Sequence, residues 1–380
     1  MLAVRECRAR TTQGSPVGKR DVRETLRNLI NKRRSLAGRG IGIEGGFLAR
    51  LLSLTASGSQ AQADVLTQAL LDMAIVRWDT KVMGYALARA LLGTTDMRNL
   101  PVKETLFSPS WRPTISDDFF SGWFRDICAL LKIEPILHRK LWEFAYTIGC
   151  LSHYGKLQSG SRALGFGCGK EPLPSFLASR GISVLATDLE PSSLVAKGWI
   201  DTAQHASSRA VLWRPELVER PDFDARVSLR HVDMNEIPPD LDGGFDFCWS
   251  ICALEHLGSI EKGLKFIRNS LDTLRPGGIA VHTTEFNCFS DSETIQNGPT
   301  VLFRRKDLGE VYQRLMDEGF ELPSLTFAAG DTPIDWFVDL PPYRWQPEYF
   351  DPAVAPALHL KVGVEGFPST CFGIVVRKPL

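Results

Sequence analysis

The amino-acid sequence predicts an α/β fold, in which an open sheet follows a helical N-terminal region. Strand-like and helix-like segments alternate along the chain after Gly160, as they do in open α/β sheets. Phe245–Ile251 is apolar on both faces, which is typical of a central parallel strand. Before Gly160, apolar residues recur three and four positions apart, which is the helical period. Because ligands of open sheets bind at the carboxyl ends of the strands, we look for function in the loops that follow them.

Composition excludes several classes of protein. The chain has 380 residues, of which 44% are hydrophobic and 23% charged, and this is the composition of a globular protein. The 44 Lys and Arg balance 44 Asp and Glu, which argues against a nucleic-acid partner. No apolar stretch approaches the roughly 18 residues of a membrane span. The eight cysteines form no Cys-x-x-Cys pair and indicate reduced thiols in a cytoplasmic protein.

The charge is unevenly distributed along the chain. Residues 1–40 contain 11 Lys and Arg against 3 Asp and Glu, which leaves 33 against 41 for the remainder. We expect residues 1–20 to be a basic, loosely ordered segment. The basic start lacks the apolar core of a secretory signal, and Asp21 and Glu24 weaken the alternative of an organellar transit peptide. Residues 21–135 are predicted to form the helical region, in which 94–115 is a proline-containing connector and Ser116–Asp118 begins a helix. This region is a lid, a homodimer interface or a partner-docking module.

Residues 136–380 contain the α/β elements. The predicted strands cover 162–165, 183–187, 226–232, 245–251, 277–283, 325–328 and 370–378. The predicted helices cover 136–154, 174–180, a segment from about Pro191, 259–274 and 306–318. The stretch between the last two strands, 329–369, is far longer than an ordinary loop and is predicted to be a lid over the substrate.

A glycine-rich turn follows the first predicted strand. Its sequence is Gly165-Phe166-Gly167-Cys168-Gly169, and glycines here permit a sharp turn and close approach to a ligand. A dinucleotide fingerprint requires glycine where Lys170 stands, so a nicotinamide enzyme is disfavoured. Asp188 ends the second strand, where a carboxylate can accept hydrogen bonds from a ribose diol. Asp233 and Met234 end the third, where they can meet an exocyclic amine and an adenine face.

With these motifs the sequence resembles the class I S-adenosylmethionine-dependent methyltransferases. The matching segments are Leu164–Gly169, Asp188, Asp233, Asp246–Leu257 and Leu274–Gly278. The resemblance implies a Rossmann-like seven-stranded sheet whose last strand is antiparallel, and S-adenosylmethionine as the cofactor. The cofactor-binding residues it implies lie at the strand ends and on the preceding helix: Gly165, Phe166, Gly167, Cys168, Gly169, Asp188, Leu189, Asp233, Met234, Ser250, Ile251, Cys252 and Trp142. In its detailed sequence the chain is similar to bacterial methyltransferases of polysaccharide or secondary-metabolite pathways.

Two strand ends carry candidate catalytic residues. Glu255 and His256 follow the fourth strand, and His256 is the first choice as general base, although it could equally pack against or cap the next helix. His282 and Glu285 follow the fifth strand. Three positions apart on a strand, they point to opposite faces unless the chain turns after Thr283. These two residues are also the candidate ligands of a divalent metal, which we do not favour.

The acceptor of the methyl group is the least defined part of the prediction. Aromatic and acidic residues in the lid suit a polar, sugar-like acceptor: Trp336, Asp339 and Tyr343. Trp199 and Gln204, between the second and third strands, are further candidates. We therefore expect an O-methyltransferase acting on a small polar molecule, a sugar or a glycan. The alternatives are an N-methyltransferase for a small molecule, and a non-catalytic cofactor-binding scaffold whose helical head docks a partner.

Overall fold

The computed structural model describes residues 68–69, 72–73, 75–77, 79–84, 86–87, 90, 102–192, 205–340 and 358–380. The chain divides into two compact units, 1–73 and 74–380, and the fold below is that of the second. The described residues between 68 and 90 are all helical. The predicted basic segment 1–20, the helix expected from about Pro191, and the candidates Trp199, Gln204 and Tyr343 lie outside the described residues.

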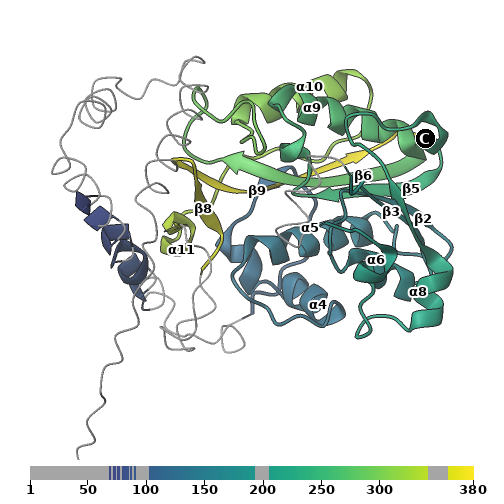
Figure 1. Ribbon diagram of the computed structural model, residues 1–380, viewed down its shortest axis with the longest axis horizontal. Helices are drawn as coiled ribbons and strands as arrows, with labels where there is room; N and C mark the ends of the chain where they lie inside the picture. The colour runs from purple at the N-terminus through teal and green to yellow at the C-terminus, as the bar shows by residue number, and fades with distance from the viewer. Residues whose placement is uncertain are drawn as a thin grey trace, which may run out of the picture. The chain divides into compact units, whose positions relative to one another are not determined.

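A single mixed sheet forms the centre of this unit (Figure 1). Its order is β4-β3-β2-β5-β6-β9-β8-β7, and β1 also pairs with β9. The strands from β4 to β6 are parallel to their neighbours, whereas β9 is antiparallel to β6. The bounds are β1 Arg112–Pro113, β2 Arg162–Phe166, β3 Ser183–Asp188, β4 Val227–His231, β5 Phe245–Ile251, β6 Leu274–Asn287, β7 Val338–Asp339, β8 Lys361–Val364 and β9 Phe367–Arg377. The predicted α/β sheet with an antiparallel last strand is confirmed, with nine strands among the described residues in place of seven.

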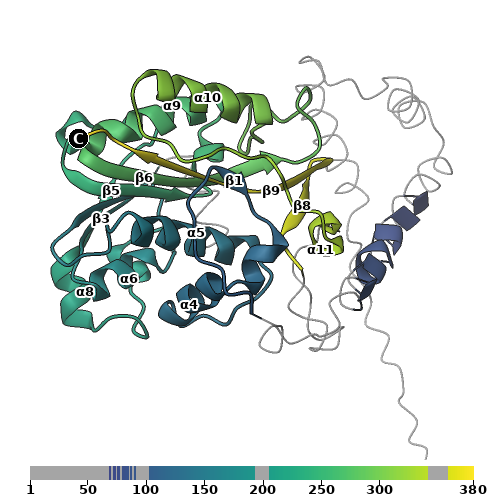
Figure 2. The same ribbon diagram turned by 180° about the vertical axis from the view of Figure 1, so that it is seen from behind.

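Helices cover both faces of the sheet. Figures 1 and 2 show α9 and α10 on one face and α4, α5, α6 and α8 on the other. The helices are α4 Gly122–Leu130, α5 Arg139–His153, α6 Leu173–Ser179, α8 Arg220–Arg226, α9 Ile260–Ser270, α10 Arg305–Asp317 and α11 Pro333–Trp336. The short 3-10 turns are η2 Ser116–Phe120, η3 Arg209–Leu212, η4 Pro239–Leu241, η5 Leu254–His256 and η6 Leu271–Thr273. In α9 the Ser259 side chain caps the first turn, and apolar residues at helical spacing face the sheet.

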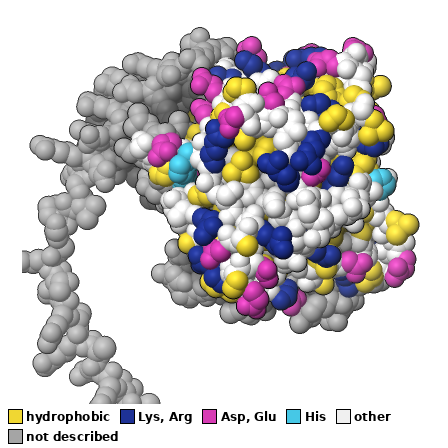
Figure 3. All heavy atoms as spheres, turned by 90° about the vertical axis from the view of Figure 1, so that its right-hand side faces the viewer, with side chains coloured by type: hydrophobic (Ala, Val, Ile, Leu, Met, Phe, Trp, Pro, Cys, Tyr) yellow, Lys and Arg dark blue, Asp and Glu magenta, His cyan; other side chains and the backbone are white. Residues whose placement is uncertain are grey.

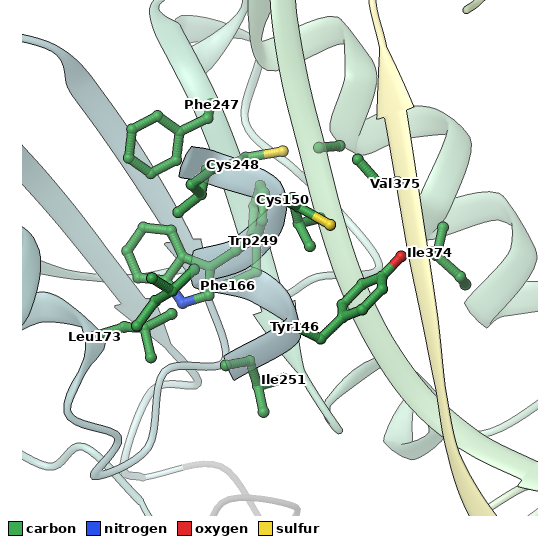
Figure 4. Packing of buried hydrophobic residues seen from close by; sticks show 14 of the residues in the cluster. Tyr146, Cys150, Phe166, Leu173, Phe247, Cys248, Trp249, Ile251, Ile374 and Val375 are labelled. Carbon is green, nitrogen blue, oxygen red and sulfur yellow. The ribbon is translucent and has the colours of Figure 1, made fainter. Parts of the chain in front are cut away.

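The core lies between β5 and the helices on either side of it (Figure 4). Every residue of β5 except Asp246 is buried, as its apolar sequence predicts. Trp249 is fully buried, and its indole N–H donates to Glu171 Oε1 at 2.5 Å, so its one polar atom is satisfied. Each such side chain contributes on the order of 1.5–3 kcal/mol of burial free energy, which fixes the positions of the strand ends that follow.

The strand predicted at 325–328 does not form, and an N-terminal segment lies beside β9 instead. Arg112 and Pro113 pair with Gly373 and Phe372 of β9. Leu325 makes only an isolated parallel bridge to Trp111, with Trp111 N donating to Ser324 O at 2.8 Å. The free edge of a strand can pair only once, so β1 displaces the 325–328 segment from the sheet.

The end of the molecule at which β9 finishes is the end at which the parallel strands begin. On this face basic, acidic and hydrophobic side chains are interspersed (Figure 3). The candidate residues belong to the opposite end of the sheet, where β2 to β6 finish. Within the described part of the chain, no helix has both the length and the apolar character needed to cross a membrane.

Candidate functional site

The glycine turn brings three strand ends together. Gly167 has φ +58° and Gly169 has φ +52°, a backbone region that residues with side chains rarely adopt. A Cβ on Gly167 would lie 2.9 Å from Ala253 Cβ and 3.3 Å from Met234 Sδ, so the ends of β2, β4 and β5 meet here. Gly165 has a different role, because a Cβ there would meet the ring of Trp249 at 2.5 Å. The turn therefore offers exposed backbone, with Gly165 required for packing below it.

The remaining side chains of the turn point into the core. Phe166 is fully buried and packs edge-on against Phe266, with ring centroids 5.2 Å apart. Cys168 is 3% exposed, and its backbone N–H donates to Thr187 O at 2.9 Å. A ligand at this turn would thus meet the backbone of Phe166 and Cys168 more than their side chains.

Asp188 organises the end of β3. Its carboxylate accepts backbone N–H groups from Leu189, Gly169 and Ala206 at 2.8, 3.2 and 2.8 Å. A carboxylate has about four lone-pair sites, so three amides leave room for one further donor on Oδ1. His205 Nε2 lies 2.9 Å from Leu189 O and 3.8 Å from Asp188 Oδ1. Asp188 holds the glycine turn and keeps capacity for a ligand hydroxyl.

The end of β4 carries Asp233 and Met234 in different environments. Asp233 is exposed, and its Oδ1 accepts the backbone N–H of Asn235 at 2.8 Å and the Asn235 side-chain amide at 3.1 Å. Met234 is 6% exposed and lies against the glycine turn. One apolar and one acidic group therefore flank the same turn.

Three other predicted cofactor residues pack inside the protein. Trp142 is fully buried, donates to Asp118 Oδ2 at 2.7 Å and stacks on Tyr146 at 4.9 Å. The hydroxyl of Ser250 lies against His282, 2.8 Å from Nδ1, and Ile251 is 7% exposed. These side chains pack beneath the site, and the polar atoms of Trp142 and Ser250 are engaged by other residues of the protein.

Beyond the end of β5 lies a group of charged residues contributed by α5 and β6. Arg139 binds Glu285 Oε1, and Ser369 Oγ donates to Glu285 Oε2 at 2.7 Å. Lys140 Nζ lies 3.1 Å from Oε1 of Glu143, which is fully buried. Arg139 is thus paired with Glu285 and Lys140 with Glu143, and such pairing offsets the free-energy cost of burying a carboxylate.

Cys252, just after β5, borders this charged group. Its Sγ lies 3.7 Å from Cys371 Sγ of β9, and both cysteines are free thiols. Burial raises the pKa of each thiol, so both are protonated at neutral pH. Arg139 also lies 3.6 Å from Cys371 Sγ.

Glu255 and His256 form the turn η5 at the edge of the site. Burial, and then the carboxylate of Glu285, raise the pKa of Glu255 to about 8. Its Oε2 accepts Thr284 Oγ1–H at 3.1 Å, and Oε1 has no hydrogen-bond partner among the described residues. His256 Nδ1 lies 2.8 Å from Pro299 O, which can only accept, so Nδ1 carries the proton and Nε2 the lone pair. That Nε2 is 3.7 Å from Glu255 Oε1.

His282 does not lie with these residues. Ser270 Oγ donates to Ile267 O, so it accepts from His282 Nε2 at 2.9 Å, while Nδ1 accepts from Ser250 Oγ. Burial lowers the pKa of this fully buried imidazole to about 3. β6 continues to Asn287 without the turn after Thr283, so His282 and Glu285 lie on opposite faces. Neither nitrogen of His282 is left for a substrate or a metal.

The lid residues are only partly described. Trp336 is 67% exposed at the end of α11. Asp339 is fully buried between Lys81 Nζ and His359 Nδ1, each 2.7 Å from a carboxylate oxygen. That contact joins the helical stretch around Lys81 to the segment predicted as a lid, and it engages the Asp339 carboxylate inside the protein.

Of the helix 136–154, only Trp142 was predicted from the sequence to be a site residue; Arg139, Lys140, Glu143, Thr283 and Cys371 were not selected. One signal was available, because Lys140 and Glu143 are three apart in a predicted helix that is otherwise apolar on that face. The partners on β6 and β9 gave no such signal, since they are 140 or more residues away.

Two groups of described residues could hold a metal ion: Glu143 with Cys252 and Cys371, and Cys252 with Glu255 and Glu285. Neither includes His282. Arg139 and Lys140 lie against these groups and oppose a further positive charge there.

Residues 164–282 match the family model described as a methyltransferase domain. A search of curated proteins finds no match. Solved structures that resemble the chain include an S-adenosylmethionine-dependent methyltransferase from Mesorhizobium loti, at 15% identity over 60% of this chain and 96% of that one, with TM-score 0.35. Another is from Methanosarcina mazei, at 17% identity over 61% and 97%, with TM-score 0.34.

Proposed function

We propose, from the premise that this chain carries a class I S-adenosylmethionine-dependent methyltransferase domain, that it methylates a hydroxyl of a small polar or sugar-like acceptor. The observation that carries the proposal is the pairing of Glu255 with His256 beside the glycine turn. Ala253, two residues before Glu255, occupies the space that a Cβ on Gly167 would enter. A base is therefore available next to the backbone that would hold the cofactor.

The residues around the glycine turn fit S-adenosylmethionine. Gly167 and Gly169 have no side chain, so the cofactor can approach the backbone of 167–169 closely. Asp188 Oδ1 can accept one further hydrogen bond, from a ribose hydroxyl, and Met234 supplies an apolar surface. Asp233 Oδ2 is available for an exocyclic amine, because the described contacts engage Oδ1. When bound, the cofactor would supply an electrophilic methyl group on its sulfonium: as the acceptor oxygen bonds to the methyl carbon, the C–S bond breaks and S-adenosylhomocysteine is the leaving group.

The chain's own contribution is alignment and removal of the hydroxyl proton. The proton moves to Nε2 of His256, whose Nδ1–H is held by Pro299 O. Burial lowers the pKa of His256, so the imidazole is in its basic form at neutral pH. The imidazolium that forms lies 3.7 Å from Glu255 Oε1, and the Glu255 carboxylate stabilises it once the pH rises above the pKa of about 8 at which this carboxyl ionises.

Two measurements test this function. Calorimetry should detect binding of S-adenosylmethionine and S-adenosylhomocysteine but not of NAD, and a protein that binds neither sulfur compound is not a methyltransferase. A methyl-transfer screen over sugar nucleotides, glycans and small amines, with and without EDTA, should find a hydroxyl acceptor whose turnover survives EDTA. Transfer only to amines would instead establish the N-methyl alternative.

His256→Ala separates catalysis from binding. We expect the variant to bind S-adenosylhomocysteine as the wild type does and to lose about 10²–10⁴ in turnover. Unchanged turnover would remove His256 as the base. Turnover of any acceptor at a useful rate would also exclude the non-catalytic scaffold.

A further inference from the structure

The chain adopts an unusual backbone conformation at the end of β5. Cys252 has φ +45°, a region that side-chain-bearing residues rarely occupy and that costs free energy unless the surroundings enforce it. The turn reverses the chain so that Ala253 reaches Gly167 and η5 begins at Leu254. Whatever enforces this conformation therefore sets the positions of both the glycine turn and Glu255.

Hydrogen bonds from β6 hold the strained residue. The backbone N–H of Cys252 donates to Thr283 O at 3.1 Å and to Thr283 Oγ1 at 3.2 Å. The Thr283 hydroxyl in turn donates to Glu143 Oε2. Because its proton is committed to Glu143, the hydroxyl presents a lone pair to Cys252.

Glu143 can fill this role because it stays ionised in the interior. Burial raises its pKa, but Lys140 and then Arg139 outweigh burial, so the pKa lies below the ordinary value. A carboxylate has only acceptor sites, so it fixes the direction of the Thr283 hydroxyl. Protonated or replaced by a methyl group, it would let that hydroxyl rotate away from Cys252.

We propose that Glu143 is a positioning residue: through Thr283 it enforces the left-handed conformation of Cys252, and so sets the turn that carries Ala253 to the glycine loop and Glu255 to the site. The inference rests on the proposed function for its catalytic meaning. The three residues belong to α5, β6 and the end of β5, so the clamp exists only in the folded chain.

Glycine at position 252 provides the test, because it adopts φ +45° without strain. Glu143→Ala should weaken S-adenosylhomocysteine binding about tenfold, as expected for release of a strained residue, and Glu143→Gln, which still accepts from Thr283, should bind nearly as well as the wild type. In a Cys252→Gly background, Glu143→Ala should lose much less affinity. Cys248→Gly, within β5 and four residues before Cys252, has no positive φ to relieve; it is the control and should give no rescue.

The same double-mutant cycle is read in urea unfolding, which needs no ligand. Because the Cys252 thiol also hydrogen-bonds Glu143, the clamp is supported by coupling between positions 143 and 252 that is lost in a Thr283→Val background, with no coupling between 143 and 248. If the wild-type protein fails to bind S-adenosylhomocysteine, the proposed function is wrong. The unfolding double-mutant cycle still tests whether Glu143 enforces the conformation of Cys252. Equal effects of Glu143→Ala in all three backgrounds, or wild-type affinity in Glu143→Ala, would overturn it.

Discussion

The two halves of the candidate site are built on different physical principles. The half at the ends of β2, β3 and β4 presents backbone and two acids: Asp233 is exposed, whereas Asp188 is buried and accepts three backbone N–H groups, one of them from the glycine turn. The half at the ends of β5 and β6 buries Arg139, Glu143 and Glu285, whose charges are tolerable only because Arg139 pairs with Glu285 of β6 and Glu143 pairs with Lys140 of its own helix. A change in the first half should therefore impair binding locally, whereas a change in the second should alter both stability and chemistry.

The largest expected effect concerns Glu255, in the buried half. Its pKa is raised to about 8, so the carboxyl is protonated below that pH and ionises above it. Methyl transfer should therefore rise with pH through about 8. Glu255→Gln should lower the rate by about 10²–10⁴ and remove this limb of the pH–rate profile. Glu171→Gln is the control, because burial also raises the pKa of Glu171 to about 8 but Trp249 occupies its carboxyl. A limb that persists in Glu255→Gln and disappears in Glu171→Gln would contradict the assignment.

Next in size is the loss of a buried cation. Arg139→Met leaves Glu285 without its partner, and the free energy of unfolding should fall by about 3–5 kcal/mol in urea titrations. The exposed pair of Lys103 and Asp117 offers the contrast, since Lys103→Met should cost less than about 1 kcal/mol. Adding Glu285→Gln to Arg139→Met should recover part of the loss. Equal losses of unfolding free energy in Arg139→Met and Lys103→Met would contradict the difference proposed between buried and exposed ion pairs.

His282 tests whether a polar residue of β6 serves the core alone. His282→Ala should cost about 2–4 kcal/mol at pH 7, because a cavity forms and the Ser250 and Ser270 hydroxyls lose a partner. The folded pKa of about 3 is depressed, so the wild-type contribution is present above about pH 6.5 and is lost as the pH falls toward 3. The difference between variant and wild type should thus narrow between pH 7 and pH 4.5. S-adenosylhomocysteine affinity measured at pH 7 should not change, and a selective loss of affinity would place His282 in the site.

The smallest expected change in stability lies in the glycine turn. Gly167→Ala should cost about 1–2 kcal/mol of unfolding free energy from backbone strain. Its effect on S-adenosylhomocysteine binding should be larger than that of Gly243→Ala, because Gly243 has a similar φ of +62° but nothing within 4 Å of its added Cβ. Calorimetry on both variants separates strain from contact. Equal affinities would mean that the glycine turn is not the cofactor site.

Local sequence patterns account for the parallel half of the fold. β5 matches its predicted range residue for residue, because a segment buried on both faces needs an unbroken apolar run. The C-terminal ends of β2, β3 and β4 each lie within one residue of the predicted ends, because glycine and acidic residues follow these strands. By contrast, the prediction of a strand at 325–328 was wrong. β1, more than 200 residues earlier in the chain, pairs with β9, and Leu325 bridges only Trp111.

The sequence by itself determined the α/β order, the glycine turn and the acidic residues at the strand ends, because each depends on neighbours a few positions away. Only the tertiary structure decided which polar residues meet. It separated His282 from Glu285 by continuing β6 straight, and it joined Glu143 to Cys252 through Thr283. The physical reason is that a buried charge is stable only beside a specific partner, and such partners are brought together by strand register and helix placement.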